Sequence, residues 1–164
     1  MTDNSPLIWL AAAYLVLLSL AVSVIDFRHL IIPNTLNAAN AGGGLVFAAL
    51  LPTTPTLASL AGGVLGFAAM LAFRVSYRRI RGRDGLGLGD VKFMTGAGVW
   101  VGWHGLAPLL LVSSLSALVF LALRGVLSGR FDPQHALPFG PFLCVGTLTV
   151  WTIQAVGAAP WIMP

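Results

Sequence analysis

Charged side chains are scarce in this chain. Only 9% of its 164 residues are charged, whereas 57% are hydrophobic, and glutamate does not occur at all. A soluble domain carries about 25% charged residues, so this composition cannot cover a globular surface in water. It is typical of an integral membrane protein, in which the net charge of +4 reports topology and does not indicate nucleic-acid binding.

Cysteine is nearly absent as well. The single Cys144 excludes an internal disulfide bond and a zinc site built from cysteines. Because it lies in an apolar run, we expect it to be a small buried hydrophobic residue. The first ten residues, MTDNSPLIWL, contain Asp3 but no lysine or arginine, so we expect no cleavable signal peptide.

Long stretches without Asp, Glu, Lys or Arg predict the membrane spans. These uncharged runs cover residues 7–25, 38–73, 93–123 and 136–164. Since a bilayer core takes about 20 helical residues, the two longer inner runs should hold two spans each. The breaks should lie in LPTTPT (51–56) and VGWHGLAP (101–108), where prolines and glycines interrupt a helix. The sequence therefore predicts an all-α, polytopic protein with six transmembrane helices, forming a single membrane-embedded domain over residues 1–164.

The basic residues test this count of spans. With six spans, the connections 26–37, 74–92 and 124–135 lie on one side of the membrane and contain all nine Lys and Arg residues. The two termini and the turns at Pro52 and Gly105 lie on the other side and contain none. Cytoplasmic connections are rich in Lys and Arg, so both termini should face away from the cytoplasm. A four-span alternative would need helices far beyond the usual length.

Two of the five acids, Asp26 and Asp90, stand out by their position. Asp26 directly follows the first apolar run and Asp90 opens the fourth expected span, so both should lie at the cytoplasmic ends of their helices. Ionisable residues at membrane depth are costly and face a cavity or a partner. Two carboxyl groups close together in a low dielectric share a proton, so one can activate water as a base while the other acts as an acid. This is aspartic peptidase chemistry, for which no metal and no cofactor is needed; pairing with Arg28 or Lys92 is the structural alternative.

The other acids and the histidines are expected to be structural or solvated. For His29, which adjoins the site, tuning of the acids is the alternative to an interfacial role. The remaining residues of this group are Asp3, Asp84, Asp132, His104 and His135.

Alternating glycines precede Asp90 in the stretch GLGLGDVKF (85–93). Glycine lacks a Cβ, so Gly87 and Gly89 would let an extended substrate backbone approach and would allow a non-helical entry to the span. The stretch lacks the full G-x-G-x-x-G spacing and a preceding strand, which argues against a nucleotide-binding loop.

Three motifs in this order resemble the prepilin peptidase family of Gly-x-Gly-Asp intramembrane aspartic peptidases. They are an aspartate after the first span followed by IIPN (31–34), then GLGDVK (87–92), then LPFGPFL (137–143). The resemblance covers the chain from about Asp26 to Leu143. It implies cleavage of the basic leader from type IV pilin-like precursors, at the cytoplasmic face of the bacterial cytoplasmic (inner) membrane, with precursors and lipids as partners.

The resemblance also implies residue roles. Asp26 and Asp90 would be the catalytic pair. The residues expected to shape the site or bind substrate are Gly87, Gly89, Lys92, Pro33, Asn34, Pro138 and Gly140. Phe139 and Pro141 match the third motif, for which we expect only a helix break near the site.

One departure from the best-known family members is visible. Those members carry a cytoplasmic insertion with paired Cys-x-x-Cys motifs and also methylate the new pilin N-terminus, whereas this sequence has one cysteine. It resembles the short branch without N-methyltransferase activity, as found with Flp-type (tight adherence) pili and some secretion systems.

Two other functions stay open. A small proton or cation transporter could use Asp26 and Asp90 as ligands, although transporters tend to place acids near the midplane and to show internal repeats, which this sequence lacks. A non-catalytic scaffold of a pilus-assembly machine is the second alternative, against which the presence of both aspartates argues.

Overall fold

The structure is a computed structural model that describes residues 5–51, 54–128 and 137–157, and the regular elements in these ranges are all helices. They are α1 (Ser5–His29), α2 (Asn34–Leu50), α3 (Thr56–Arg81), α4 (Leu88–Ser128) and α5 (Gly140–Ala155). The predicted all-α class is confirmed. By length and composition, α1, α3 and α4 can cross a membrane, whereas α2 and α5 are shorter, so six separate crossings stay a prediction.

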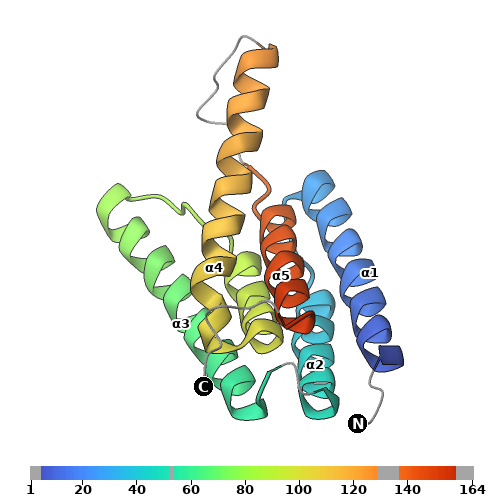
Figure 1. Cartoon of the computed structure of the whole chain (residues 1–164). Helices are drawn as coiled ribbons and strands as arrows, with labels where there is room; N and C mark the ends of the chain where they lie inside the picture. Colours follow the sequence, from blue (N-terminus) through green and yellow to red (C-terminus); the bar gives the residue numbers. More distant parts are fainter. Residues whose placement is uncertain (1–4, 52–53, 129–136, 158–164) are drawn as a thin grey trace.

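Helix α4 is broken at Gly102. This residue has φ 67° and ψ 174°, a conformation that is accessible essentially only to glycine. The break divides α4 into a first half (88–101) and a second half (103–128) that run in opposite directions (Figure 1). The prediction of a break within 101–108 is confirmed. The turn lies at Gly102 and not at Gly105, because Gly102 is the position with positive φ.

The helices continue past the apolar runs into the basic segments. α3 includes Arg74 and Arg81 and ends at Gly82, whose left-handed φ of 67° is the common helix C-cap conformation. α4 includes Arg124 and projects beyond the other helices in Figure 1. Because arginine is a good helix former, segments that the sequence analysis treated as connections are largely helical, and the α3–α4 connection is only 82–87.

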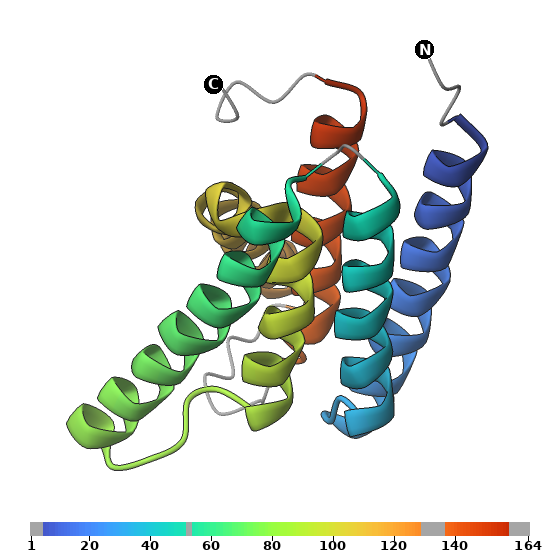
Figure 2. The same ribbon diagram turned by 90° about the horizontal axis from the view of Figure 1, so that it is seen from below.

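Helix α4 is the centre of the bundle and packs against α2, α3 and α5, while α1 packs against α2 and α5 (Figures 1 and 2). The α3–α4 contact is made by glycines: a Cβ added to Gly62 would overlap the carbonyl oxygen of Gly98, and one added to Gly98 would overlap that of Gly62. Small residues allow this close approach between membrane helices. It fixes the first half of α4, and with it the segment that starts at Leu88.

Candidate active site

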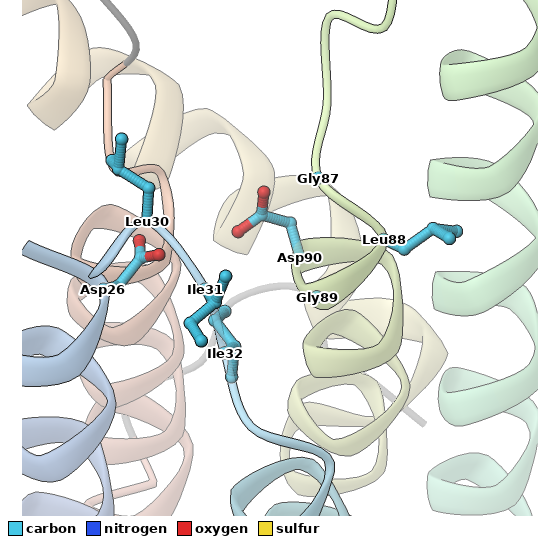
Figure 3. Close-up of a pocket in the computed structure, with 8 residues that line it drawn as sticks. All are labelled: Asp26, Leu30, Ile31, Ile32, Gly87, Leu88, Gly89 and Asp90. Atoms are coloured by element: carbon cyan, nitrogen blue, oxygen red, sulfur yellow. The ribbon is translucent and has the colours of Figure 1, made fainter.

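Asp26 and Asp90 line the same cavity. Asp26 belongs to the last turn of α1 and Asp90 to the first turn of α4, and their exposed fractions are only 4% and 8%. The cavity measures about 310 Å³, and its other lining residues are Leu30, Ile31, Ile32, Gly87, Leu88 and Gly89. In Figure 3 the carboxyl group of Asp90 points toward the side of the cavity on which Asp26 lies. The structure thus brings together the two acids that the sequence singled out.

The carboxyl group of Asp26 is held by the start of α5. The backbone N–H of Gly140 donates a hydrogen bond to its Oδ2 at 2.9 Å. Gly140 is the first residue of α5, where N–H groups lack helical partners and the helix dipole is positive. A Cβ at Gly140 would lie 2.8 Å from the same Oδ2, so glycine is needed for this approach. This contact explains the third sequence motif, for which the sequence predicted only a helix break.

The carboxyl group of Asp90 is held by the start of its own helix. It accepts a hydrogen bond from the backbone of Gly87, the residue before α4, in the manner of a helix capping box. A Cβ at Gly87 would lie 3.0 Å from Oδ2 of Asp90. At Gly89 the added Cβ would lie 3.2 Å from both the backbone N and the Cβ of Ile32. The Cβ direction at Gly89 is therefore taken up by Ile32, while Gly89 also lines the cavity.

The segment 30–32 forms one wall of the cavity and was not predicted. Leu30 has a positive φ of 55°, and its N–H donates to the carbonyl of Asp26 at 2.9 Å, so the chain turns directly after α1. A leucine in this conformation is strained, which indicates that the surroundings constrain it. Leu30 and Ile31 are exposed, whereas Ile32 is buried against Gly89. Pro33 could have indicated the end of the helix here, since a residue before proline favours an extended conformation.

Lys92 does not pair with either acid. Its Nζ donates to Oδ1 of Asn34 at 2.9 Å, which connects α4 to the first residue of α2. Within the described ranges, the ion pairs of lysine and arginine join Asp84 to Arg74 (3.0 Å) and to Arg78 (3.9 Å). The structural alternative, in which Asp26 or Asp90 pairs with Arg28 or Lys92, is therefore not observed.

Two buried asparagines, which the sequence analysis missed, support Asp90 from α2. Asn37 Nδ2 donates to the carbonyl of Gly89 at 3.4 Å, and Asn40 Nδ2 donates to that of Phe93 at 3.2 Å. Both carbonyls lie within three residues of Asp90. These contacts could have been expected from the sequence, because two amide side chains occur in an apolar segment and a buried polar group needs a partner.

The remaining predicted residues lie around this site. Pro33 directly precedes α2, Pro138 lies two residues before α5, and neither is among the lining residues. Cys144 is buried, as expected, and the ring of His104 lies tilted against the ring of Trp103 with a centroid distance of 3.6 Å. His29 ends α1 and is exposed. Four residues named from the sequence lie outside the described ranges, namely Asp3, Pro52, Asp132 and His135.

Comparison with known proteins decides the family. The model of the type IV leader peptidase family matches residues 13–122, which include both aspartates. The chain belongs to this family. The predicted relationship to prepilin peptidases is thereby confirmed.

Several curated relatives match most of the chain. It is 29% identical over 136 residues to the "Prepilin leader peptidase/N-methyltransferase" of Aeromonas salmonicida (strain A449). The aligned region covers 83% of the chain and 46% of that protein. It is 31% identical over 137 residues to a protein of the same name from Dickeya chrysanthemi, covering 84% and 48%. It is 29% identical over 133 residues to "Leader peptidase HopD" of Escherichia coli, covering 81% and 86%. The chain thus spans about half the length of the first two relatives, and no solved structure matches it.

Proposed function

We propose that the chain is a membrane-embedded aspartic endopeptidase that removes the leader peptide from type IV pilin-like precursors. The observation that carries this proposal is the placement of Asp26 and Asp90. They come from different helices, are both buried, line one cavity and have no lysine or arginine partner in the described ranges. Membership of the type IV leader peptidase family supports the substrate class.

The mechanism needs one ionised and one protonated carboxyl group. Two buried acids beside one cavity do not ionise together easily, so they hold one proton between them. The ionised group takes a proton from a water molecule, and the resulting hydroxide attacks the carbonyl carbon of the scissile amide. The protonated group donates a hydrogen bond to the carbonyl oxygen and then helps to protonate the leaving amine. The N–H of Gly140 fixes the Asp26 carboxyl and that of Gly87 fixes the Asp90 carboxyl throughout these steps.

We place cleavage at the cytoplasmic face of the bacterial cytoplasmic membrane. The cavity lies between the C-terminus of α1 and the N-terminus of α4, on the side of the bundle on which the arginine-rich end of α3 also lies (Figure 2). Basic residues mark the cytoplasmic side. The leader would then lie in the cytoplasm, while the apolar helix that follows the scissile bond stays in the membrane.

The transporter and scaffold alternatives are less well supported. Both acids lie at helix ends on one side of the bundle, whereas transporters bind ions near the midplane. A scaffold would have no use for two buried carboxyl groups that have no lysine or arginine partner among the described residues, because such groups are costly to keep in a membrane protein.

Asparagine substitutions test the catalytic pair. Asp26→Asn and Asp90→Asn should each lower the rate of precursor cleavage by roughly 10²–10⁴-fold or more, because one carboxyl group cannot serve as both acid and base. Asp84→Asn is the matched control, since Asp84 is half exposed and pairs with arginines outside the cavity. Cleavage is measured on a gel with purified proteins in lipid. Full activity after substitution of Asp26 or Asp90 would remove the proposed mechanism.

We also propose that this chain does not methylate its product. The connections between helices that the structure describes in full, 30–33 and 82–87, are too short to enclose a cofactor the size of S-adenosylmethionine. The Escherichia coli relative, of which the match covers 86%, is named only as a leader peptidase. Relatives about twice as long as this chain are named peptidase/N-methyltransferase.

Intact mass spectrometry of the cleaved product tests the absence of methylation. With S-adenosylmethionine and this chain as the only enzyme, the new N-terminus should stay an unmodified amine. A control reaction without S-adenosylmethionine should release the leader at the same rate. A mass gain of one methyl group would contradict the proposal.

A further inference from the structure

An apolar groove runs along the second half of α4 beside α5. It measures about 520 Å³, and its main lining residues are Val112, Leu115, Val119 and Leu123 from α4 with Phe142 and Val145 from α5. The α4 residues recur every three to four positions, so they lie on one face of the helix. From the first to the last of them the groove extends about 16 Å along α4, at 1.5 Å per residue. This is about three helical turns.

The groove offers only apolar contacts. Ser116 is the one hydroxyl residue in its lining, and its Oγ already donates to the carbonyl of Ser113 at 2.9 Å. Leu115, Val119 and Leu123 are all more than half exposed. An occupant with polar groups along its length would find no partner here, so the groove suits an apolar segment whose backbone is satisfied internally, as in a membrane helix.

The groove is continuous with the candidate active site. The ring of Phe120, which also lines the groove, packs on Phe142 at 5.5 Å and on Phe27 at 6.4 Å. Phe27 directly follows Asp26, and Phe142 lies two residues after Gly140, whose N–H binds the Asp26 carboxyl. α5 lies beside the second half of α4, and the start of α5 lies near the end of α1 (Figure 1). A segment in the groove would therefore end close to the catalytic pair.

We propose that this groove binds the apolar helix of the precursor that adjoins the scissile bond. This inference rests on the function proposed above. A helix that remains in the membrane can reach Asp26 and Asp90 only from the side, and an open apolar groove beside them provides this route. Residues four and seven positions apart, such as Leu115, Val119 and Val112, are the pattern with which one helix packs on another. The groove then sets which bond is cut, because it fixes the start of the substrate helix relative to the acids.

Photocross-linking tests the occupant directly. A benzophenone amino acid is placed at Val119, which lines the groove, or at Leu118, which is exposed on the same turn but does not line it. Both are made in the Asp90→Asn background so that precursor is retained. Cross-links to the precursor helix should form from position 119 and not from 118. Equal cross-linking from both positions, or cross-links to lipid alone from 119, would overturn the proposal.

Kinetics separate failure of the groove from failure of the proposed activity. Val119→Trp fills the groove and should lower kcat/KM for the full precursor about tenfold through KM, whereas Leu118→Trp should not. The ratio of kcat/KM for the full precursor to kcat/KM for a peptide that ends a few residues after the scissile bond should therefore fall in Val119→Trp and should keep its wild-type value in Leu118→Trp. If wild type cuts no precursor, the proposed function is wrong. If wild type cuts and Val119→Trp behaves as Leu118→Trp does, only the groove assignment is wrong.

Discussion

Backbone N–H groups, and not charged side chains, hold the two carboxyl groups of the candidate site. Asp26 binds the N–H of Gly140 at 2.9 Å, and Asp90 binds the backbone of Gly87. Backbone donors at helix starts are rigid and favour a nearby carboxylate without adding a titrating partner. An added Cβ would lie 2.8 Å from Oδ2 of Asp26 at Gly140 and 3.0 Å from Oδ2 of Asp90 at Gly87, so either side chain would press on a carboxyl group.

Gly140→Ala should therefore impair catalysis more than stability. The added Cβ meets Oδ2 of Asp26, so the carboxyl group must shift, and a misplacement of about 1 Å can cost roughly 100-fold in rate. Gly42→Ala is the matched control, because a Cβ at Gly42 in α2 has no neighbour within 4 Å. The measurement is kcat for precursor cleavage at matched protein levels. Equal rates for the two variants would show that the Gly140 contact does not position Asp26.

The sequence identified the two acids but could predict only part of their surroundings. Asp26 and Asp90 were visible because charge at the end of an apolar run is rare. The contact between Asp26 and Gly140 joins residues 114 positions apart, and no local pattern reveals which atoms meet over that separation. The strained Leu30 was not predictable either, since its positive φ follows from the turn between α1 and α2 and contradicts its intrinsic preference.

At the scale of elements, glycine decides where helices turn and where they touch. Gly102 reverses α4, and Gly62 with Gly98 allows α3 and α4 to meet backbone to backbone. The sequence predicted the broken α4 because glycines and a proline cluster in 101–108. It did not predict which of the many glycines make the α3–α4 contact, because that depends on the relative rotation of two helices.

Gly62→Ala should destabilise the bundle. Its Cβ would overlap the carbonyl oxygen of Gly98, which is backbone and cannot move aside, so α3 and α4 must separate. Overpacking of this kind costs about 1–3 kcal/mol in unfolding free energy. The unfolding free energy is measured by circular dichroism during titration with a denaturing detergent. Gly42→Ala should be at least as stable as wild type, and equal stability of the Gly62 variant would contradict the assigned contact.

For the whole molecule, the asymmetry of charge predicts orientation. The arginine-rich end of α3, the C-terminus of α1 and the N-terminus of α4 lie on the same side of the bundle (Figure 2), and the two catalytic candidates belong to α1 and α4. An apolar run does not indicate how far a helix continues beyond it, so Arg74 and Arg124 were predicted to lie in connections. The structure extends α3 and α4 through these residues. The predicted orientation in the membrane is unchanged, because it depends on which end of each helix is basic and not on where the helix stops.

Cysteine labelling tests this orientation. In intact cells a membrane-impermeant maleimide should label Thr56→Cys, at the first residue of α3, and should label Arg83→Cys only after the membrane is opened. Both side chains are exposed, whereas the neighbouring Thr54 is buried and would be a poor probe. The native Cys144 has an exposed fraction of 2%, so the unmodified chain serves as an unlabelled control. Labelling of Arg83→Cys but not Thr56→Cys in intact cells would invert the topology. The two aspartates would then face the outer side of the membrane, where a leader that is still in the cytoplasm could not reach them.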